Sequence, residues 1–249
     1  TASYEARPYG VHSAMPSAHA KRLCPHAIWT SGHFDRYREM SAKVMDILAD
    51  ETPFVDQVSI DEAFFDITPG RFSRENPIEL ASSISRRVSE LGITCSIGLG
   101  TSKTVAKIAS DRDKPHGLTI VPPGTEENFL EPLPVRAMSG IGTSAEASLK
   151  RMGIYTLGQL AAAPVARLVT VFGSNAQLMH DRAAGLEMSG VAPIDAPEET
   201  KSVSNERTFA QDLTERDDID AALALLGESV GRRLRRRGLA GRTVTVKVK

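Results

Sequence analysis

The sequence contains few cysteines, with only Cys24 and Cys95 among its 249 residues. Secreted domains that rely on disulfides use many more, so we expect a protein of the reducing cytoplasm whose two thiols are buried as small apolar groups. No apolar run approaches the roughly 20 residues that span a bilayer. The first residues also lack the basic and apolar regions of a secretion signal. The sequence therefore predicts no membrane partner.

Aromatic residues are scarce as well, at 5% of the chain, and neither sign of charge is in excess, because the net charge is −1. Hydrophobic residues at 41% and charged residues at 24% are typical of a folded protein and exclude a disordered or collagen-like chain. A length of 249 residues exceeds one average domain, so two or three domains are expected. The chain begins with Thr1 rather than Met, and we expect it to start partway through a fold.

The basic residues are unevenly distributed along this nearly neutral chain. Residues 232–249 hold eight basic side chains and no acidic one, whereas acidic residues gather at 212–220. A concentrated basic tip is what contact with a phosphate backbone requires. A solvated helix face is the alternative interpretation of the same run. The five candidate contact residues are Arg232, Arg233, Arg235, Arg236 and Arg237.

The apolar pattern predicts an α+β fold with several domains. Residues 1–33 are expected to form short helices and loops, residues 124–184 an all-helical region, and residues 185–199 a linker. The order of the elements is typical of an α+β or split βαβ layer with helices covering one face. The predicted elements are helices at 35–52, 77–91, 101–110 and 219–237 and strands at 54–60, 63–67, 93–99, 118–121, 202–209 and 243–248.

Two adjacent carboxylates, Asp61 and Glu62, stand between the strands predicted at 54–60 and 63–67. Neighbouring residues in a strand point to opposite faces, but at the apex of a hairpin both side chains can serve one site. Asp-Glu is poor chemistry for a tight hairpin turn, which prefers Asn-Gly or Asp-Gly. This departure from the usual residues of a tight turn indicates that Asp61 and Glu62 are a functional pair. A solvated acidic turn is the alternative.

The hairpin sequence Ser59-Ile60-Asp61-Glu62-Ala63-Phe64 resembles the metal-binding hairpin of the Y-family DNA polymerases, the translesion enzymes, and especially their DNA polymerase IV (DinB-like) branch. Three further segments match in the same order. Residues 1–11 resemble the fingers motif of the family, residues 96–117 its palm, and residues 140–154 its helix–hairpin–helix thumb. The resemblance covers nearly the whole chain.

The resemblance implies a right-hand-like polymerase fold in several domains. They are fingers at 1–33, palm at 34–123, thumb at 124–188, a linker at 189–200 and a little finger at 201–249. The family's first palm strand, with its own metal-binding Asp and ribonucleotide-excluding aromatic residue, is expected to lie outside this chain. So are the end of the little finger and a tail that binds a sliding clamp. The chain alone is therefore expected to be inactive.

The function that the resemblance implies is DNA-directed synthesis of DNA by a low-fidelity translesion enzyme in damage tolerance and repair. Two Mg²⁺ ions would be held by Asp61 and Glu62, because hard cations prefer carboxylate oxygens. The partners would be primer–template DNA and deoxynucleoside triphosphates, bound by a monomer. The residues implied for the triphosphate are Thr1, Tyr4, Arg7 and Lys114, and those implied for the DNA backbone are Gly140, Ile141 and Gly142.

Two other classes of function remain as alternatives. The first is a non-catalytic, polymerase-like scaffold of DNA repair, which would have no need of Asp61 and Glu62. The second is a helix–hairpin–helix binding module alone, which would leave the two hairpin carboxylates unexplained.

Overall fold

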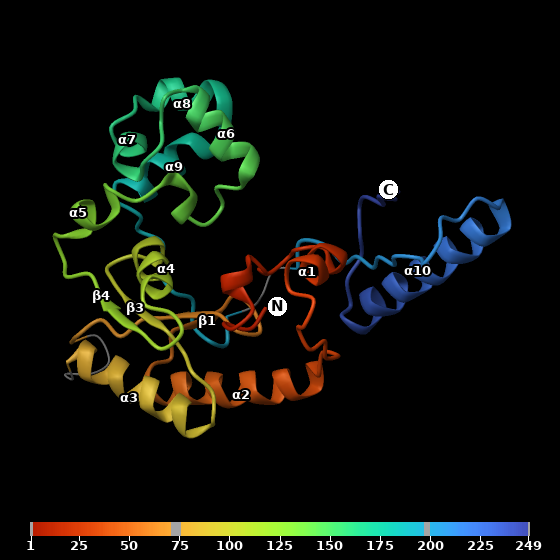
Figure 1. Cartoon of the computed structure of the whole chain (residues 1–249), viewed down its shortest axis with the longest axis horizontal. Helices are drawn as coiled ribbons and strands as arrows, with labels where there is room; N and C mark the ends of the chain where they lie inside the picture. The colour runs from red at the N-terminus through yellow and green to blue at the C-terminus, as the bar shows by residue number, and fades with distance from the viewer. Residues whose placement is uncertain (1, 71–75, 197–199, 249) are drawn as a thin grey trace. The chain divides into compact units, whose positions relative to one another are not determined.

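The computed structural model describes residues 2–70, 76–196 and 200–248 (Figure 1). The chain divides into two units, Thr1–Ile194 and Asp195–Lys249. Among the described residues, no helix combines the length and the apolar character that crossing a bilayer requires. Thr1, for which the resemblance implies contact with the triphosphate, lies outside the described residues.

The N-terminal region contains short helices and loops, as predicted. The 3₁₀ helix η1 spans Arg7–Tyr9 and helix α1 spans Ser17–Leu23. Gly10 ends η1 with a φ of 81°, a left-handed conformation that glycine adopts without strain. Cys24, directly after α1, is buried.

Two long helices follow close to their predicted positions. Helix α2 spans Phe34–Glu51 and α3 spans Pro77–Glu90. The side chain of Asn76 caps α3 by accepting a hydrogen bond from the backbone N–H of Ile78 at 3.0 Å. The predicted apolar face of α3 is buried in a cluster with the end of α2 and strand β1. Arg87 of α3 pairs with both Asp50 and Glu51, which ties the two helices together.

Four short strands form two separate pairs. Strand β1 (Val55–Gln57) pairs antiparallel with β2 (Ala63–Phe65), and β3 (Ile97–Leu99) pairs parallel with β4 (Leu118–Ile120). Helix α4 (Lys103–Arg112) connects β3 to β4. The predicted order of elements is confirmed in this region, but all four strands, predicted at 54–60, 63–67, 93–99 and 118–121, are shorter than predicted. The reason is that only three residues of each find a ladder partner.

Helix α4 packs directly on strand β3. A Cβ placed on Gly98 would lie 1.9 Å from the carbonyl oxygen of Ala106, so only glycine allows this approach. Val105 and Ala109 of α4 are fully buried. The opposite side of α4, with Lys103 and Lys107, is left for polar contacts.

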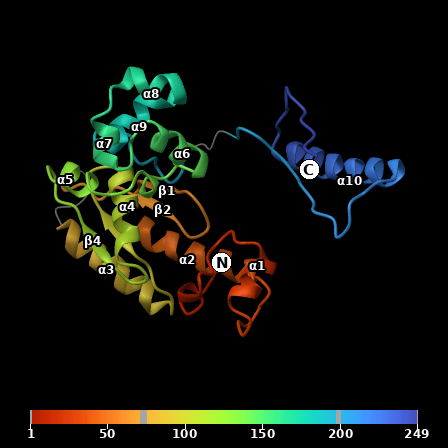
Figure 2. The same ribbon diagram turned by 45° about the horizontal axis from the view of Figure 1, so that its top comes forward.

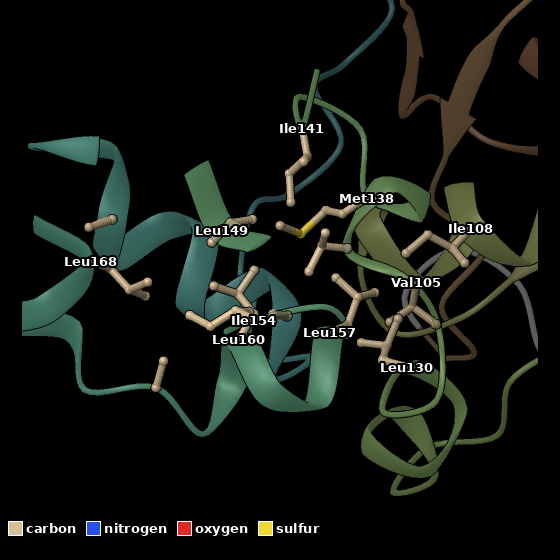
Figure 3. Packing of buried hydrophobic residues seen from close by; sticks show 14 of the residues in the cluster. Val105, Ile108, Leu130, Met138, Ile141, Leu149, Ile154, Leu157, Leu160 and Leu168 are labelled. Carbon is tan, nitrogen blue, oxygen red and sulfur yellow. The ribbon is translucent and has the colours of Figure 1, made fainter. Parts of the chain in front are cut away.

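The region after β4 is all-helical, as predicted. Its residues share one apolar cluster with Val105 and Ile108 of α4, and Figure 3 shows these two side chains beside Leu130 and Leu157. The elements are α5 (Glu126–Leu130), η2 (Val135–Ala137), α6 (Thr143–Arg151), α7 (Leu157–Ala161), α8 (Val165–Phe172) and α9 (Asn175–Ala183).

The second unit contains helix α10 (Arg216–Arg236), drawn in blue in Figure 2. The predicted helix is confirmed, three residues longer at its start. The strands predicted at 202–209 and 243–248 are wrong, because residues 200–248 as described contain no strand. A β-rich segment becomes a strand only when a neighbour satisfies its backbone groups, and neither segment has such a ladder.

Candidate active site

The acidic hairpin turns one residue earlier than the sequence suggests. The carbonyl oxygen of Glu62 accepts backbone hydrogen bonds from Val58 at 2.9 Å and from Ser59 at 3.1 Å. Together with the β1–β2 register, these bonds place the apex at Ile60. Asp61 and Glu62 therefore do not form the apex together, because they lie on its β2 side. Both are exposed, so neither carboxylate is buried in an apolar core.

The turn holds Asp61 through a local hydrogen-bond pair. The hydroxyl of Ser59 donates to Oδ1 of Asp61 at 2.7 Å, and its oxygen accepts the backbone N–H of Asp61 at 3.3 Å. Short polar side chains often stabilise turns in this way. Ser59 thus orients the carboxylate through Oδ1 while Asp61 as a whole remains exposed.

Glu62 is held from the opposite direction by helix α4. Nζ of Lys107 lies 2.5 Å from Oε1 of Glu62 and 3.7 Å from Oδ2 of Asp111. Burial alone would lower the pKa of Lys107, but the hydrogen bond to Glu62 and the charges of Asp111 and Glu62 outweigh burial and raise it. Lys107 therefore stays charged and balances the charge of Glu62.

A second lysine, one helical turn earlier, repeats this arrangement. Nζ of Lys103 lies 2.6 Å from Oδ2 of Asp56 in β1 and 5.4 Å from the centre of the Phe64 ring in β2. Sequence reasoning missed Lys103, Lys107 and Asp56. The i, i+4 spacing of the two lysines on α4 was the available signal, since it places them on one face.

The donor type of the hairpin fits a hard divalent cation. Asp61 and Glu62 offer carboxylate oxygens, the ligands that Mg²⁺ prefers. Within residues 2–70, 76–196 and 200–248, no group of three or more histidine, cysteine, aspartate or glutamate side chains is arranged to hold a metal ion. The pair therefore supplies part of a ligand set.

Tyr4 and Arg7, two of the residues predicted to bind the triphosphate, contact each other. The guanidinium carbon of Arg7 lies 4.0 Å from the centre of the Tyr4 ring, and both side chains are exposed. Nζ of Lys114 instead lies 2.6 Å from Oδ1 of Asp111, the residue that also contacts Lys107. Among the described side chains, no hydrogen bond, ion pair or ring contact joins Tyr4 or Arg7 to Lys114 or to the hairpin.

The glycine turn before α6 exposes backbone rather than side chains. Gly140 has a φ of 95°, and Gly142 caps α6 without a side-chain hydrogen bond, so the first N–H groups of α6 have no side-chain partner. Ile141 is only 5% exposed, which limits any contact it makes with a ligand to its backbone. Arg136 supports the turn, because its guanidinium donates to the carbonyl oxygen of Ile141 at 2.9 Å.

The environment of this turn differs from the prediction in one respect. The helix–hairpin–helix resemblance implies a helix before the turn, but the segment there is the three-residue 3₁₀ helix η2, which directly follows Pro134. An open hollow of about 490 Å³ lies over the turn, lined by Arg136, residues 137–142 and Asp111.

The five arginines of the predicted DNA-binding run are all exposed at the end of α10. Cations at this end of a helix interact favourably with its dipole, and the acidic Asp217 and Asp218 stand in the first turn. Arg233 also has a structural contact, since its guanidinium donates to the carbonyl oxygen of Ser204 at 2.7 Å.

Comparison with known proteins places the chain in a family. The profile of the impB/mucB/samB family matches residues 1–111, and the profile of its C-terminal domain matches residues 200–249. DNA polymerase IV of Dehalococcoides mccartyi (strain CBDB1) is 43% identical over 249 residues, which are all of this chain and 63% of that protein. DNA polymerase IV of Alkalilimnicola ehrlichii is 41% identical, and the chain covers 69% of it. The chain belongs to the Y-family of DNA polymerases.

Solved structures agree with this membership of the DNA polymerase IV (DinB-like) branch. The DinB family error-prone DNA polymerase of Sulfolobus solfataricus matches with a TM-score of 0.70 and 30% identity, over 76% of this chain and 58% of that one. An insertion ternary complex of Dbh DNA polymerase matches with a TM-score of 0.69 and 31% identity, over 76% of this chain and 56% of that one. The predicted family and polymerase fold are confirmed. The chain spans about 63% of the length of the first relatives.

Proposed function

We propose that this protein is a DNA-directed DNA polymerase of the translesion type, with the acidic hairpin as part of its active site. The observation that carries the proposal is the pair of exposed carboxylates, Asp61 and Glu62, on a hairpin of a Y-family fold. A DNA-repair scaffold without catalysis would have no use for this pair. The ion pair of Glu62 with Lys107 of α4 also supports a functional pair over a solvated acidic turn.

Asp61 and Glu62 are the residues of this chain that would hold divalent metal, with Mg²⁺ as the expected ion. When bound, such ions activate the attacking hydroxyl and neutralise charge on the transferred phosphate. The chain itself contributes orientation, since Ser59 fixes one oxygen of Asp61. Lys107 contributes charge balance, since its ammonium group pairs with the carboxylate of Glu62.

The incoming nucleotide would be bound through its phosphates by Tyr4, Arg7 and Lys114. A guanidinium and an ammonium both form charge-assisted hydrogen bonds with phosphate oxygens. The stacking of Arg7 on Tyr4 holds the guanidinium plane in place while both groups remain exposed. Thr1 is a fourth candidate in the same role.

Duplex DNA would be bound through its backbone by the glycine turn at 140–142 and by the arginine run at 232–237. Uncapped N–H groups at a helix start and exposed arginines both suit phosphate. Neither element carries the aromatic side chains that stack single-stranded bases, so duplex DNA is the expected ligand. Because contacts to the backbone do not read the bases, binding is expected to be nearly independent of sequence. We further propose that the enzyme acts as a monomer and engages a sliding clamp.

The test is Asp61→Asn in the intact protein. Primer extension should fall by roughly 100- to 1,000-fold or more, the usual cost of removing a group that stabilises transition-state charge. Binding of primer–template DNA, measured by fluorescence anisotropy, should stay unchanged because Asp61 is an exposed turn residue. Asp46→Asn, an exposed aspartate of α2, is the matched control. Unchanged extension by Asp61→Asn would refute the proposal.

A further inference from the structure

Three polar side chains form a network where helix α4 of the palm meets the end of the thumb. Nε of Arg182, in α9, donates to Oγ1 of Thr104 at 2.6 Å. Oε2 of Glu187 accepts the backbone N–H of Thr104 at 2.9 Å, and its Oε1 lies 3.8 Å from Nε of Arg182. We call this set the Thr104 network. Through this network, Arg182 and Glu187 contact the first turn of α4, although they lie 78 and 83 positions after Thr104 in the sequence.

The network is nearly buried and fully satisfied. Thr104 is 1% exposed and the side chain of Glu187 is 10% exposed. Burial would raise the pKa of Glu187, but the hydrogen bonds from Thr104 and Ser189 and the charge of Arg182 outweigh it and lower the pKa. The charge of Glu187 is stable at this nearly buried position only while each of its partners stays in place. The three side chains can therefore adopt few arrangements.

The chain enters and leaves the thumb at this same end of α4. A Cβ on Gly185 would lie 2.9 Å from Cβ of Glu126, so the outgoing chain touches the incoming one. Thr101, just before α4, donates through its hydroxyl to Oε1 of Glu126 at 2.6 Å. Both crossings between palm and thumb are therefore attached to the start of α4.

The apolar contacts between palm and thumb have a different character. Val105 and Ile108 of α4 pack against Leu130 and Leu157 in a continuous cluster (Figure 3). Apolar packing is favourable but non-directional, so it holds the thumb without specifying one orientation. Hydrogen bonds and ion pairs are directional, and the Thr104 network supplies them.

The same turn of α4 also contacts the acidic hairpin. Lys103, the residue before Thr104, pairs with Asp56 of β1. We propose that Thr104, Arg182 and Glu187 are positioning residues that set the orientation of the thumb relative to the acidic hairpin, and with it the grip on duplex DNA. The part that concerns DNA rests on the proposed function. None of the three residues contacts the hairpin carboxylates directly, so they are not catalytic residues.

The first experiment measures orientation without DNA or activity. Spin labels are attached at Ser82→Cys in α3 and Thr170→Cys in α8, in a background of Cys24→Ala and Cys95→Ala, and the interlabel distance distribution is recorded. Glu187→Gln, which keeps the size of the side chain and removes its charge, should broaden or shift the distribution. Asp181→Asn is the control, because Asp181 carries the same charge six residues before Glu187 and its side chain pairs only with residues of α9.

The second variant is Thr104→Val, which removes the acceptor of Arg182 and leaves the backbone amide in place. It should broaden the distribution as well, and urea unfolding confirms that both variants are folded. If both give the distribution of the parent and of Asp181→Asn, the inference is overturned.

The second experiment measures the consequence for DNA in the intact protein. Glu187→Gln should weaken binding of primer–template DNA by about tenfold, the scale of one hydrogen bond to a charged group. The nucleotide KM and the single-turnover rate at saturating DNA should not change, whereas general damage to the fold would alter them too. A broadened distribution with unchanged DNA affinity would overturn the link to DNA. A parent protein without primer extension would refute the proposed function, while the distance measurement would still decide the role of the network.

Discussion

Helix α3 in the first unit and helix α10 in the second have similar amphipathic patterns but different surroundings. Helix α3 has 14 residues and buries four of them, whereas α10 has 21 residues and buries none. Among the residues that the structure describes, all the buried ones lie in the first unit. The comparison shows that a helical pattern is sufficient to specify a helix, while burial depends on whether another layer covers its apolar face.

The β-rich segments of the two units show the same difference. The β1–β2 hairpin has only three residue pairs, but Val55 is buried and Phe65 packs on the cluster beneath α2 and α3. The segments 202–209 and 243–248 have comparable sequences and no buried residue. A two-stranded ribbon is marginal unless it packs on another layer, so the β1–β2 hairpin forms and the other pair does not.

The largest expected effect is the loss of stability when a buried side chain of the first unit is truncated. Leu157→Ala removes a fully buried side chain of the first unit and should lower the free energy of unfolding by about 2–5 kcal/mol. Leu223→Ala in α10, where the leucine is 40% exposed, should cost less than about 1 kcal/mol. Urea unfolding of both variants checks the comparison, and equal losses would contradict it.

A pH series should show a smaller effect that is specific to the first unit. The pKa of Glu187 is below its ordinary value of 4.5, so its stabilising contribution is complete above pH 4.5 and is lost as pH falls through the lower folded-state value. Glu187→Gln should cost about 1.5–3 kcal/mol at pH 7, as expected for hydrogen bonds to a charged group. The difference from the parent should shrink below pH 4.5 in urea unfolding. A difference that stays constant down to pH 3 would show that charge is not the cause.

Arg7→Ala tests whether an exposed charge of the first unit binds the nucleotide. The nucleotide KM should rise by about 10- to 100-fold, corresponding to roughly 1.4–2.8 kcal/mol of charge-assisted hydrogen bonding. Steady-state primer extension measures this change, with Arg22→Ala, an exposed arginine of α1, as the control. If KM stays at the parent value, Arg7 does not contact the triphosphate.

Substitutions in the arginine run of the second unit should have the smallest effect on the stability of the protein, because these side chains are exposed. A triple variant, Arg232→Ala, Arg235→Ala and Arg236→Ala, leaves the structural contact of Arg233 intact. The slope of log K for DNA against log salt should flatten by about 2.7, at 0.9 for each phosphate contact. The control is the double variant Arg38→Ala in α2 and Arg86→Ala in α3, which removes two exposed arginines of the first unit. The parent slope in the triple variant would identify the run as a solvated helix face.

Much of the first unit could be predicted from local sequence signals. Pro77 and Asn76 mark the start of α3, and the alternation around Asp61 and Glu62 marks a hairpin. These elements depend on residues within one or two turns of each other, so their patterns are visible in the sequence. The strand lengths and the strands of the second unit were predicted less well, since a strand depends on a partner that the local pattern does not reveal.

The sequence by itself determined the order of helices and strands from α2 to β4, the acidic hairpin, the glycine turn and the basic end of α10. Only the tertiary structure decided that Lys107 pairs with Glu62 and that Glu187 caps α4, because these partners are 45 and 83 residues apart. It also decided that Ile141 faces the core instead of a ligand. The physical reason is that periodicity and turn chemistry act between near neighbours, whereas the contacts of a charged side chain depend on which distant segments the apolar core brings together.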